Sequence, residues 1–184
     1  TYQIPVFPTS SPYITSVGGT EWSGGPLFPN PKKPIAWSRS GGGFSWQFPM
    51  AKHQRLAVST YLEENKAHLP PLSSFNGSTR AYPDVSAVAV YGTSQSAPTI
   101  AGIFSLITDI RFQKGLPPLG FLGPRLYQMH ERFPGESWED ITEGNTNTSC
   151  DNGFSASVGW DPLTGLGRPV WTGLQRHFAS DENI

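Results

Sequence analysis

A serine that stands at the start of an apolar helix can act as a nucleophile. Ser94 lies in the stretch Gly-Thr-Ser-Gln-Ser-Ala-Pro, residues 92–98, and a mostly apolar run follows it. Gly92 permits a tight entry into the helix, and Pro98 is tolerated in the first turn, where its missing N–H has no intrahelical partner. Free backbone N–H groups and the positive end of the helix dipole would stabilise negative charge near Ser94. The stretch therefore predicts the serine of a hydrolase, presented at the tip of a buried helix.

The segments around Ser94 predict strands alternating with helices. Residues 80–90 begin with a turn and continue as a mostly small, apolar stretch, which indicates a buried strand that leads towards Ser94. Apolar residues at three- and four-residue spacing predict a helix from about Ser96 to Lys114, ended by Gly115. We also expect a strand over 13–17, helices over 50–67, 124–130 and 171–178, and mostly loops over 21–40 and 134–169. This alternation favours an α/β architecture.

Composition and charge limit the classes of protein that fit this chain. Its 184 residues suit one domain or the larger part of one, and 20 Gly with 18 Pro residues predict many turns. A net charge of -1 without a basic stripe argues against nucleic acid as a partner. No apolar run has the roughly 20 residues that a transmembrane helix needs. The chain begins at Thr1 without a signal peptide, so we expect a mature product or a fragment.

Two features leave alternatives open at this point. Residues 41–43 are three consecutive glycines, which allow close backbone approach either to a substrate or to another strand. Cys150 is the only cysteine, so it is either a free thiol or the remaining half of a pair.

Five segments, in order along the chain, resemble one family of peptidases. They read SPYITSVGGT (11–20), GGGFS (41–45), RAYPDV (80–85), GTSQSAP (92–98) and VGWDPLTGLG (158–167). Together they resemble the C-terminal part of a sedolisin, a serine-carboxyl peptidase. The stretch PPLGFLGPRLYQ (117–128) is similar to the lysosomal, tripeptide-releasing members found in animals. The resemblance covers nearly the whole chain.

The resemblance implies a fold and an activity. It implies a subtilisin-like parallel sheet flanked by helices and incomplete at its N-terminal side, with residues 1–184 as the C-terminal portion of a single catalytic domain. Ser94 would be the nucleophile. The family's glutamate base, its orienting aspartate and the protonated aspartate of the oxyanion hole lie upstream of the segment that matches Thr1–Thr20, so this chain alone is expected to be inactive. The implied activity is release of tripeptides from peptide N-termini at acid pH.

Departures from the family pattern motivate a second hypothesis. Only about six residues separate Val85 from Gly92, where the family usually has a longer segment that contributes to the cleft wall. A catalytically inactive relative that binds peptides is therefore the alternative, and a subtilase fragment is a weaker one.

Other residues could be proposed as substitute bases. The pairs Glu136/Asp140 and Glu139/Glu143 have i,i+4 spacing, but Pro and Gly beside them make a poor helix context. No histidine lies in a motif like that of a subtilisin base, so surface or packing roles are expected for His53, His68, His130 and His177.

The resemblance also implies a calcium site. Asp140 and Asp161 would supply carboxylate oxygens, and Ile141, Ser157 and Gly159 would supply backbone carbonyls. Calcium takes six to eight oxygen ligands, so a water would complete the shell. The ion would then tie residues 134–169 to the core.

Further expectations concern processing and partners. Asn76-Gly77-Ser78 and Asn147-Thr148-Ser149 are glycosylation sequons, of which we favour the first. Both suit the secretory route to the lysosome. The expected partners are peptide substrates and the upstream part of the same domain, which would hold a partner for Cys150. Without that part, exposed sheet edges and core faces predict poor folding or aggregation of the isolated chain.

Overall fold

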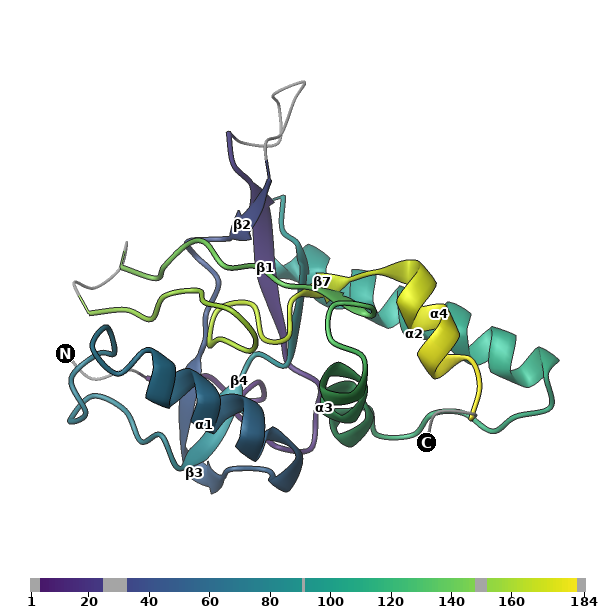
Figure 1. Cartoon of the computed structure of the whole chain (residues 1–184), viewed down its shortest axis with the longest axis horizontal. Helices are drawn as coiled ribbons and strands as arrows, with labels where there is room; N and C mark the ends of the chain where they lie inside the picture. Colours follow the sequence, from purple (N-terminus) through teal and green to yellow (C-terminus); the bar gives the residue numbers. More distant parts are fainter. Residues whose placement is uncertain (1–3, 25–32, 91, 148–151, 182–184) are drawn as a thin grey trace.

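The computed structural model describes residues 4–24, 33–90, 92–147 and 152–181 (Figure 1). Strands and helices alternate along these residues, as expected for an α/β fold. In chain order the elements are β1 (Val17–Trp22), β2 (Pro34–Ala36), β3 (Gly43–Pro49), a 3-10 turn (Lys52–Gln54), α1 (Arg55–Glu64), β4 (Thr79–Tyr82), β5 (Val85–Val88), α2 (Thr93–Gln113), α3 (Gly123–Arg132), β6 (Trp138–Glu139), β7 (Arg168–Pro169) and α4 (Trp171–Phe178).

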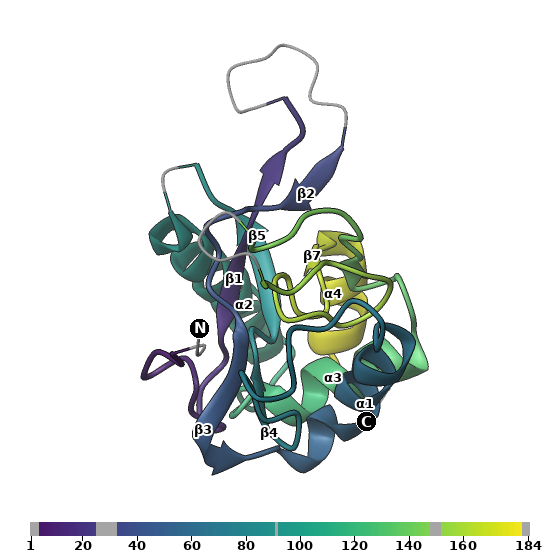
Figure 2. The ribbon, with the colours of Figure 1, turned by 90° about the vertical axis from the view of Figure 1, so that its left-hand side faces the viewer.

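The sheet that positions Ser94 has the strand order β2-β1-β5. β1 and β5 are parallel, with Val17 opposite Val85, and β2 adds an antiparallel edge. β2 and the end of β1 project from the body of the chain in both views (Figure 2). α2 packs on β1 and β5. Gly19 allows this approach, since a Cβ there would lie about 3.0 Å from the Ala89 side chain and 3.3 Å from that of Thr93.

Several predicted boundaries differ from the observed ones. The strand expected over 13–17 lies at Val17–Trp22 instead, because pairing with β5 extends across Gly18 and Gly19. The segment expected as a turn followed by one strand over 80–90 contains two strands, β4 and β5, which belong to different sheets. Pro83 stands between them and cannot donate a backbone N–H to a strand ladder. β2 lies in the predicted 21–40 loop, and β3 had no predicted counterpart.

Helices are predicted more closely than strands. α1 falls within the predicted 50–67 segment, and α4 spans Trp171–Phe178 as expected. α2 begins at Thr93, three residues before the predicted start, so the Thr-Ser-Gln residues after Gly92 are part of the helix. Its outward face leaves Leu106 and Phe112 more than half exposed.

An aromatic cluster joins β3 and α1 to the C-terminal loops. The Phe44 ring lies 5.0 Å from that of Phe75 and 5.5 Å from that of Phe154, between ring centroids. Trp160 packs edge-on against Tyr61 at 5.7 Å. These rings are buried, so the cluster fixes the 152–160 segment to the body of the domain.

A buried ion pair joins four further segments. Arg80 and Asp84 are each 1% exposed, and the guanidinium donates two hydrogen bonds to the carboxylate, at 2.9 and 2.6 Å. The same carboxylate accepts hydrogen bonds from the Ser16 N–H at 2.8 Å, the Tyr127 hydroxyl at 3.0 Å and the Gln54 amide at 3.2 Å. Asp84 is therefore a junction between β5, α3, the 3-10 turn and the entry into β1.

Candidate active site and candidate calcium site

Ser94 is the second residue of α2 and is exposed. Gly92, with φ of +145°, forms the turn into the helix, a conformation that favours glycine. The N-cap residue Gly92 makes no side-chain hydrogen bond to the first N–H groups of the helix. Two residues on, the buried Ser96 hydroxyl donates a hydrogen bond to the Ala87 carbonyl at 3.0 Å and fixes the helix start to β5. The structure thus has the predicted serine at the tip of a rigid helix.

A pocket of about 560 Å³ opens beside Ser94. Thr93 and Ala97 of the helix contribute to its wall, together with Tyr82 at the end of β4. The remaining lining comes from 14–17, from Gly41 and Gly42, and from the N-terminal segment through Ile4, Val6, Pro8 and Thr9. The pocket is therefore assembled from segments that are far apart in the sequence, which is why spacing alone did not reveal Tyr82 or the N-terminal residues.

The first two residues of the glycine stretch have different surroundings. A Cβ on Gly42 would lie 1.6 Å from the Pro162 carbonyl oxygen, so this glycine permits close packing against protein backbone. A Cβ on Gly41 would have no neighbour within 4 Å. Gly41 is exposed, and both glycines line the pocket that holds Ser94.

Within the described residues, the lining of the Ser94 pocket has no aspartate, glutamate or histidine. The carboxylates with i,i+4 spacing have partners elsewhere. Glu136 binds Arg176 and His177, Glu139 binds Arg168, and Glu143 binds Lys33. Residues 134–143 also form no helix, as their Pro and Gly content predicted.

The histidines have the surface and packing environments that the sequence predicted. His177 is buried, stacked on Phe133 with ring centroids 4.1 Å apart. His53 packs against Tyr127, and burial lowers its pKa. Burial also lowers the pKa of the half-buried His130, while His68 is exposed.

Asp161 is a fully buried carboxylate. One oxygen accepts hydrogen bonds from the N–H groups of Leu163 and Thr164, both at 2.8 Å, and the other accepts one from the Ser157 N–H at 3.3 Å. Burial raises the pKa of Asp161 to about 7 despite these bonds. Among the described residues, no Lys or Arg pairs with it.

Asp140 is bonded to the same turn as Asp161. One carboxylate oxygen accepts a hydrogen bond from the Gly159 N–H at 2.7 Å, and the other is buried without a partner in the described part of the chain. Burial raises the pKa of this carboxyl too. The 157–159 turn is therefore hydrogen-bonded to both carboxylates, and the second Asp140 oxygen is buried and unsatisfied among the described residues.

These residues fit a hard cation better than a transition metal. No group of three or more His, Cys, Asp or Glu side chains gathers anywhere in the described residues, so a metal here would rely on backbone oxygens. Two carboxylates with carbonyls of Ile141, Ser157 and Gly159 would form an all-oxygen donor set, which calcium prefers. The buried, partnerless oxygen of Asp140 is the observation that supports a cation at this site.

Some predicted features lie outside the described residues. These are Cys150 and, in the second sequon, Thr148 and Ser149. Asn76 of the first sequon is exposed. No helix in the described part of the chain is long and apolar enough to cross a membrane.

Comparison with known proteins gives a consistent set of relatives. The chain is 45% identical over 193 residues to tripeptidyl-peptidase 1 of Bos taurus and 44% identical over 189 residues to that of Homo sapiens, each covering 92% of the chain. It spans 32% of these relatives, about a third of their length. No family model matches the chain.

A solved structure shares the fold. Pseudomonas sedolisin, a serine-carboxyl proteinase complexed with two molecules of pseudo-iodotyrostatin, superposes with a TM-score of 0.71 at 22% identity, over 95% of this chain and 48% of that one. The α/β fold with helices flanking the sheet is thereby confirmed, and the partial coverage fits a C-terminal part. The chain is therefore similar in sequence to a part of tripeptidyl-peptidase 1 and shares its fold with a sedolisin.

Proposed function

We propose that this chain is the nucleophile-bearing, C-terminal part of a serine-carboxyl peptidase that releases tripeptides from peptide N-termini at acid pH. The observation that carries the proposal is the position of Ser94, exposed at the start of α2 and beside a pocket of about 560 Å³. The sequence similarity and the fold support the reaction class.

In this proposal the Ser94 hydroxyl attacks the scissile carbonyl and forms an acyl-enzyme, which water then hydrolyses. The start of α2 contributes backbone N–H groups and the positive end of its dipole, which favour negative charge beside the serine. Gly41 and Tyr82 line the pocket in which the peptide would lie. The Ser94 hydroxyl loses its proton when it attacks, so it needs a proton acceptor, and the described lining offers no carboxylate or imidazole. We therefore assign the base and the oxyanion donor to residues outside this chain.

We also propose that calcium binds between Asp140 and Asp161, with the carbonyls of Ile141, Ser157 and Gly159. A bound ion would neutralise two carboxylates that burial makes costly to ionise. With the ion bound, these ligand residues would hold the 134–169 loops against the aromatic cluster. The role is structural, because these residues do not line the Ser94 pocket.

The alternative function is binding of peptides without turnover. Two observations favour it: the absence of a base from the described pocket lining, and the short connection of residues 89–92 between β5 and α2. A secretory route to the lysosome is proposed on the same grounds of similarity as the peptidase activity.

The test is hydrolysis of a fluorogenic tripeptide substrate at about pH 4 by the full protein that carries this chain. Ser94→Ala should lower kcat by about four to six orders of magnitude, the loss typical of removing a serine nucleophile. Ser105→Ala is the matched control, since this serine is exposed on the same helix away from the pocket. Turnover that survives Ser94→Ala would exclude Ser94 as the nucleophile. No turnover by the unaltered protein would favour the binding function.

A further inference from the structure

The buried pair of Arg80 and Asp84 is bonded to one wall of the Ser94 pocket. Residues 14–17 form part of that wall, together with Tyr82, which stands between the two members of the pair in the sequence. Neither Arg80 nor Asp84 lines the pocket, and each side chain is 1% exposed. Any effect of the pair on a bound peptide must therefore pass through the wall.

The pair holds this wall at two points. The Arg80 Nε–H donates a hydrogen bond to the Ser11 carbonyl at 3.1 Å, and the Ser16 N–H donates one to the Asp84 carboxylate at 2.8 Å. The Asp84 N–H also donates to the Ser16 carbonyl, at 2.9 Å. The planar guanidinium has several donors, so it bonds Ser11 and Asp84 at the same time. Both ends of the 11–16 segment are thus attached to one ion pair.

The helix that carries Ser94 is attached to the same strand as this wall. Asp84 directly precedes β5, and the Ala87 carbonyl of β5 accepts a hydrogen bond from the Ser96 hydroxyl at 3.0 Å. The wall is therefore bonded to the residue before β5 and the helix to its interior. Because the two attachments are separate, loosening of the ion pair would release the wall and leave the serine in place.

We propose that Arg80 and Asp84 are positioning residues for peptide binding, which fix the 11–16 segment so that the Ser94 pocket has its shape before the peptide arrives. A wall that is already ordered loses no further conformational freedom when the peptide binds. Loss of the pair should therefore weaken peptide binding and leave the chemical step at Ser94 unaltered. The inference rests on the proposed function only in that the peptide is bound in this pocket.

The first test compares the full protein with its Arg80→Lys variant in hydrolysis of the fluorogenic tripeptide substrate at about pH 4. Lysine keeps a positive charge beside Asp84 but lacks the planar fork that bonds Ser11 and Asp84 together. We expect KM to rise about tenfold, the change that corresponds to loss of one hydrogen bond to a charged group, and kcat to stay within about twofold. A purely structural role would reduce the amount of active enzyme, so kcat would fall at constant KM. That outcome would overturn the inference.

A second test measures peptide binding without turnover. In the Ser94→Ala background, the Kd of the same substrate is measured by titration calorimetry, and Arg80→Lys should raise it by the same factor as KM. A protein that binds the peptide but never cleaves it would refute the peptidase activity and leave the positioning role intact. An unchanged Kd would refute the positioning role. Absence of binding to the parent protein would exclude this pocket as the peptide site and would refute both.

Tyr127→Phe carries the test if Arg80→Lys does not fold. This change removes one hydrogen bond to Asp84, of 3.0 Å, and leaves the two charges paired. Tyr127 belongs to α3 and does not line the Ser94 pocket. We expect KM to rise about threefold, which is at the low end for loss of one neutral hydrogen bond. An unchanged KM in this variant would contradict the inference.

A matched control comes from a second buried arginine. Arg111 is 2% exposed, pairs with Asp181 at 2.8 Å and donates to the Pro117 carbonyl at 2.7 Å. None of these residues lines the Ser94 pocket. Arg111→Lys should therefore lower Tm and leave KM unchanged. A rise in KM as large as that of Arg80→Lys would mean that any loss of stability weakens peptide binding, and would contradict a specific role of the Arg80 pair.

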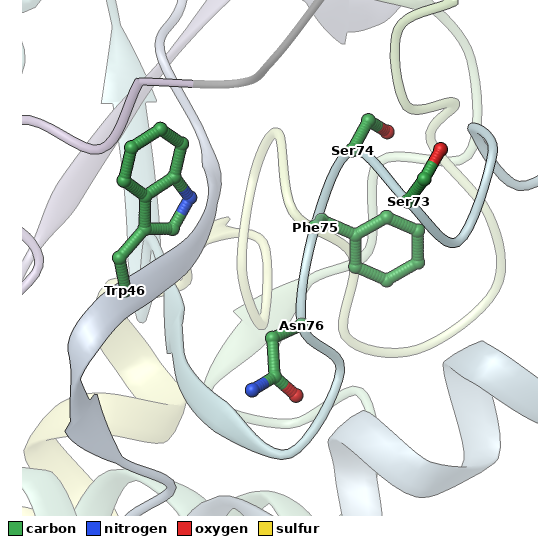
Figure 3. A pocket seen from close by; sticks show the side chains of 5 residues that line it. All are labelled: Trp46, Ser73, Ser74, Phe75 and Asn76. Atoms are coloured by element: carbon green, nitrogen blue, oxygen red, sulfur yellow. The ribbon is translucent and has the colours of Figure 1, made fainter.

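A second control uses a different pocket, of about 460 Å³, which lies between Trp46 of β3 and residues 73–76 (Figure 3). It shares no lining residue with the Ser94 pocket. Ser73 is exposed, so Ser73→Leu should narrow this pocket without changing the core. We expect KM to be unchanged. A rise in KM comparable to that of Arg80→Lys would place the peptide in this second pocket and would overturn the inference.

Discussion

The Ser94 pocket and the turn between Asp140 and Asp161 are built in opposite ways. The pocket draws its walls from segments spread over the first hundred residues, its serine is exposed, and its described lining has no group that could accept the serine proton. The turn brings together two carboxylates only 21 positions apart, both bonded to residues 157–159. A site formed by neighbouring residues can be complete within part of a domain, whereas a site formed by distant residues needs the rest of the domain.

The largest expected difference between the two regions is in stability. Asp161→Ala should lower the free energy of unfolding by about 3 kcal/mol, because it leaves the buried N–H groups of Leu163 and Thr164 without an acceptor. Ser94→Ala, at an exposed position, should change it by less than about 0.5 kcal/mol. Urea unfolding of both variants of the full protein measures the contrast. Similar losses would show that the two regions do not differ in this way.

Calcium removal should act on one region and spare the other. If the ion binds as proposed, saturation to about 100 times its Kd adds about 2.7 kcal/mol to the free energy of unfolding. Thermal unfolding with a chelator, and after calcium is restored, measures this gain. Asp161→Ala should abolish it, while Ser94→Ala should leave it unchanged. A gain that persists in Asp161→Ala would place the ion elsewhere.

Gly41 and Gly42 both line the Ser94 pocket and provide a second test of the comparison. Gly42→Ala should lower the free energy of unfolding by about 1–3 kcal/mol, because its Cβ would overlap the Pro162 carbonyl. Gly41→Ala has room and should be close to neutral for stability, but its methyl group would project into the pocket and raise KM. Chemical unfolding and steady-state kinetics of the two variants separate these effects. A destabilising Gly41→Ala would mean that the pocket side of this stretch is also packed.

The smallest effect, measured per pH unit, is the pH dependence of the calcium-free protein. Burial raises the pKa of Asp161 from 3.8 to about 7 in the folded state, so folding favours the protonated carboxyl. Its contribution to stability is full below pH 3.8 and is lost as the pH rises through about 7. The free energy of unfolding should therefore fall with rising pH, with a slope of at most about 1.4 kcal/mol per pH unit. Asp161→Asn should remove this slope, and a slope that is unchanged in this variant would contradict the assignment.

The sequence predicted local features better than long-range ones. The turn at Gly92, the start of a helix near Ser94 and the final helix follow from residues close together in the chain, and the structure contains them. β1 was misplaced, because Gly18 and Gly19 have weak strand propensity and only pairing with β5 makes them a strand.

The sites show the same division. The spacing around Ser94 indicated the nucleophile, but nothing in it indicated that Tyr82 and the N-terminal residues form the pocket wall. The sequence also did not indicate that Asp84 joins several segments. The sequence did contain one signal, because Arg80 and Asp84 are oppositely charged and four residues apart. A buried pair of this kind needs further hydrogen-bond partners from other segments, which the sequence does not identify.

The junction at Asp84 also determines how the molecule can open. Its carboxylate accepts hydrogen bonds from the Ser16 N–H, the Gln54 amide and the Tyr127 hydroxyl at once. Detachment of any one of these segments would remove a hydrogen bond from a buried carboxylate. Opening of one segment at this junction is therefore costly in free energy, and the elements around Asp84 should unfold together. In hydrogen exchange, the Ser16 amide should belong to the slowest group of the chain and should exchange only when the whole domain unfolds.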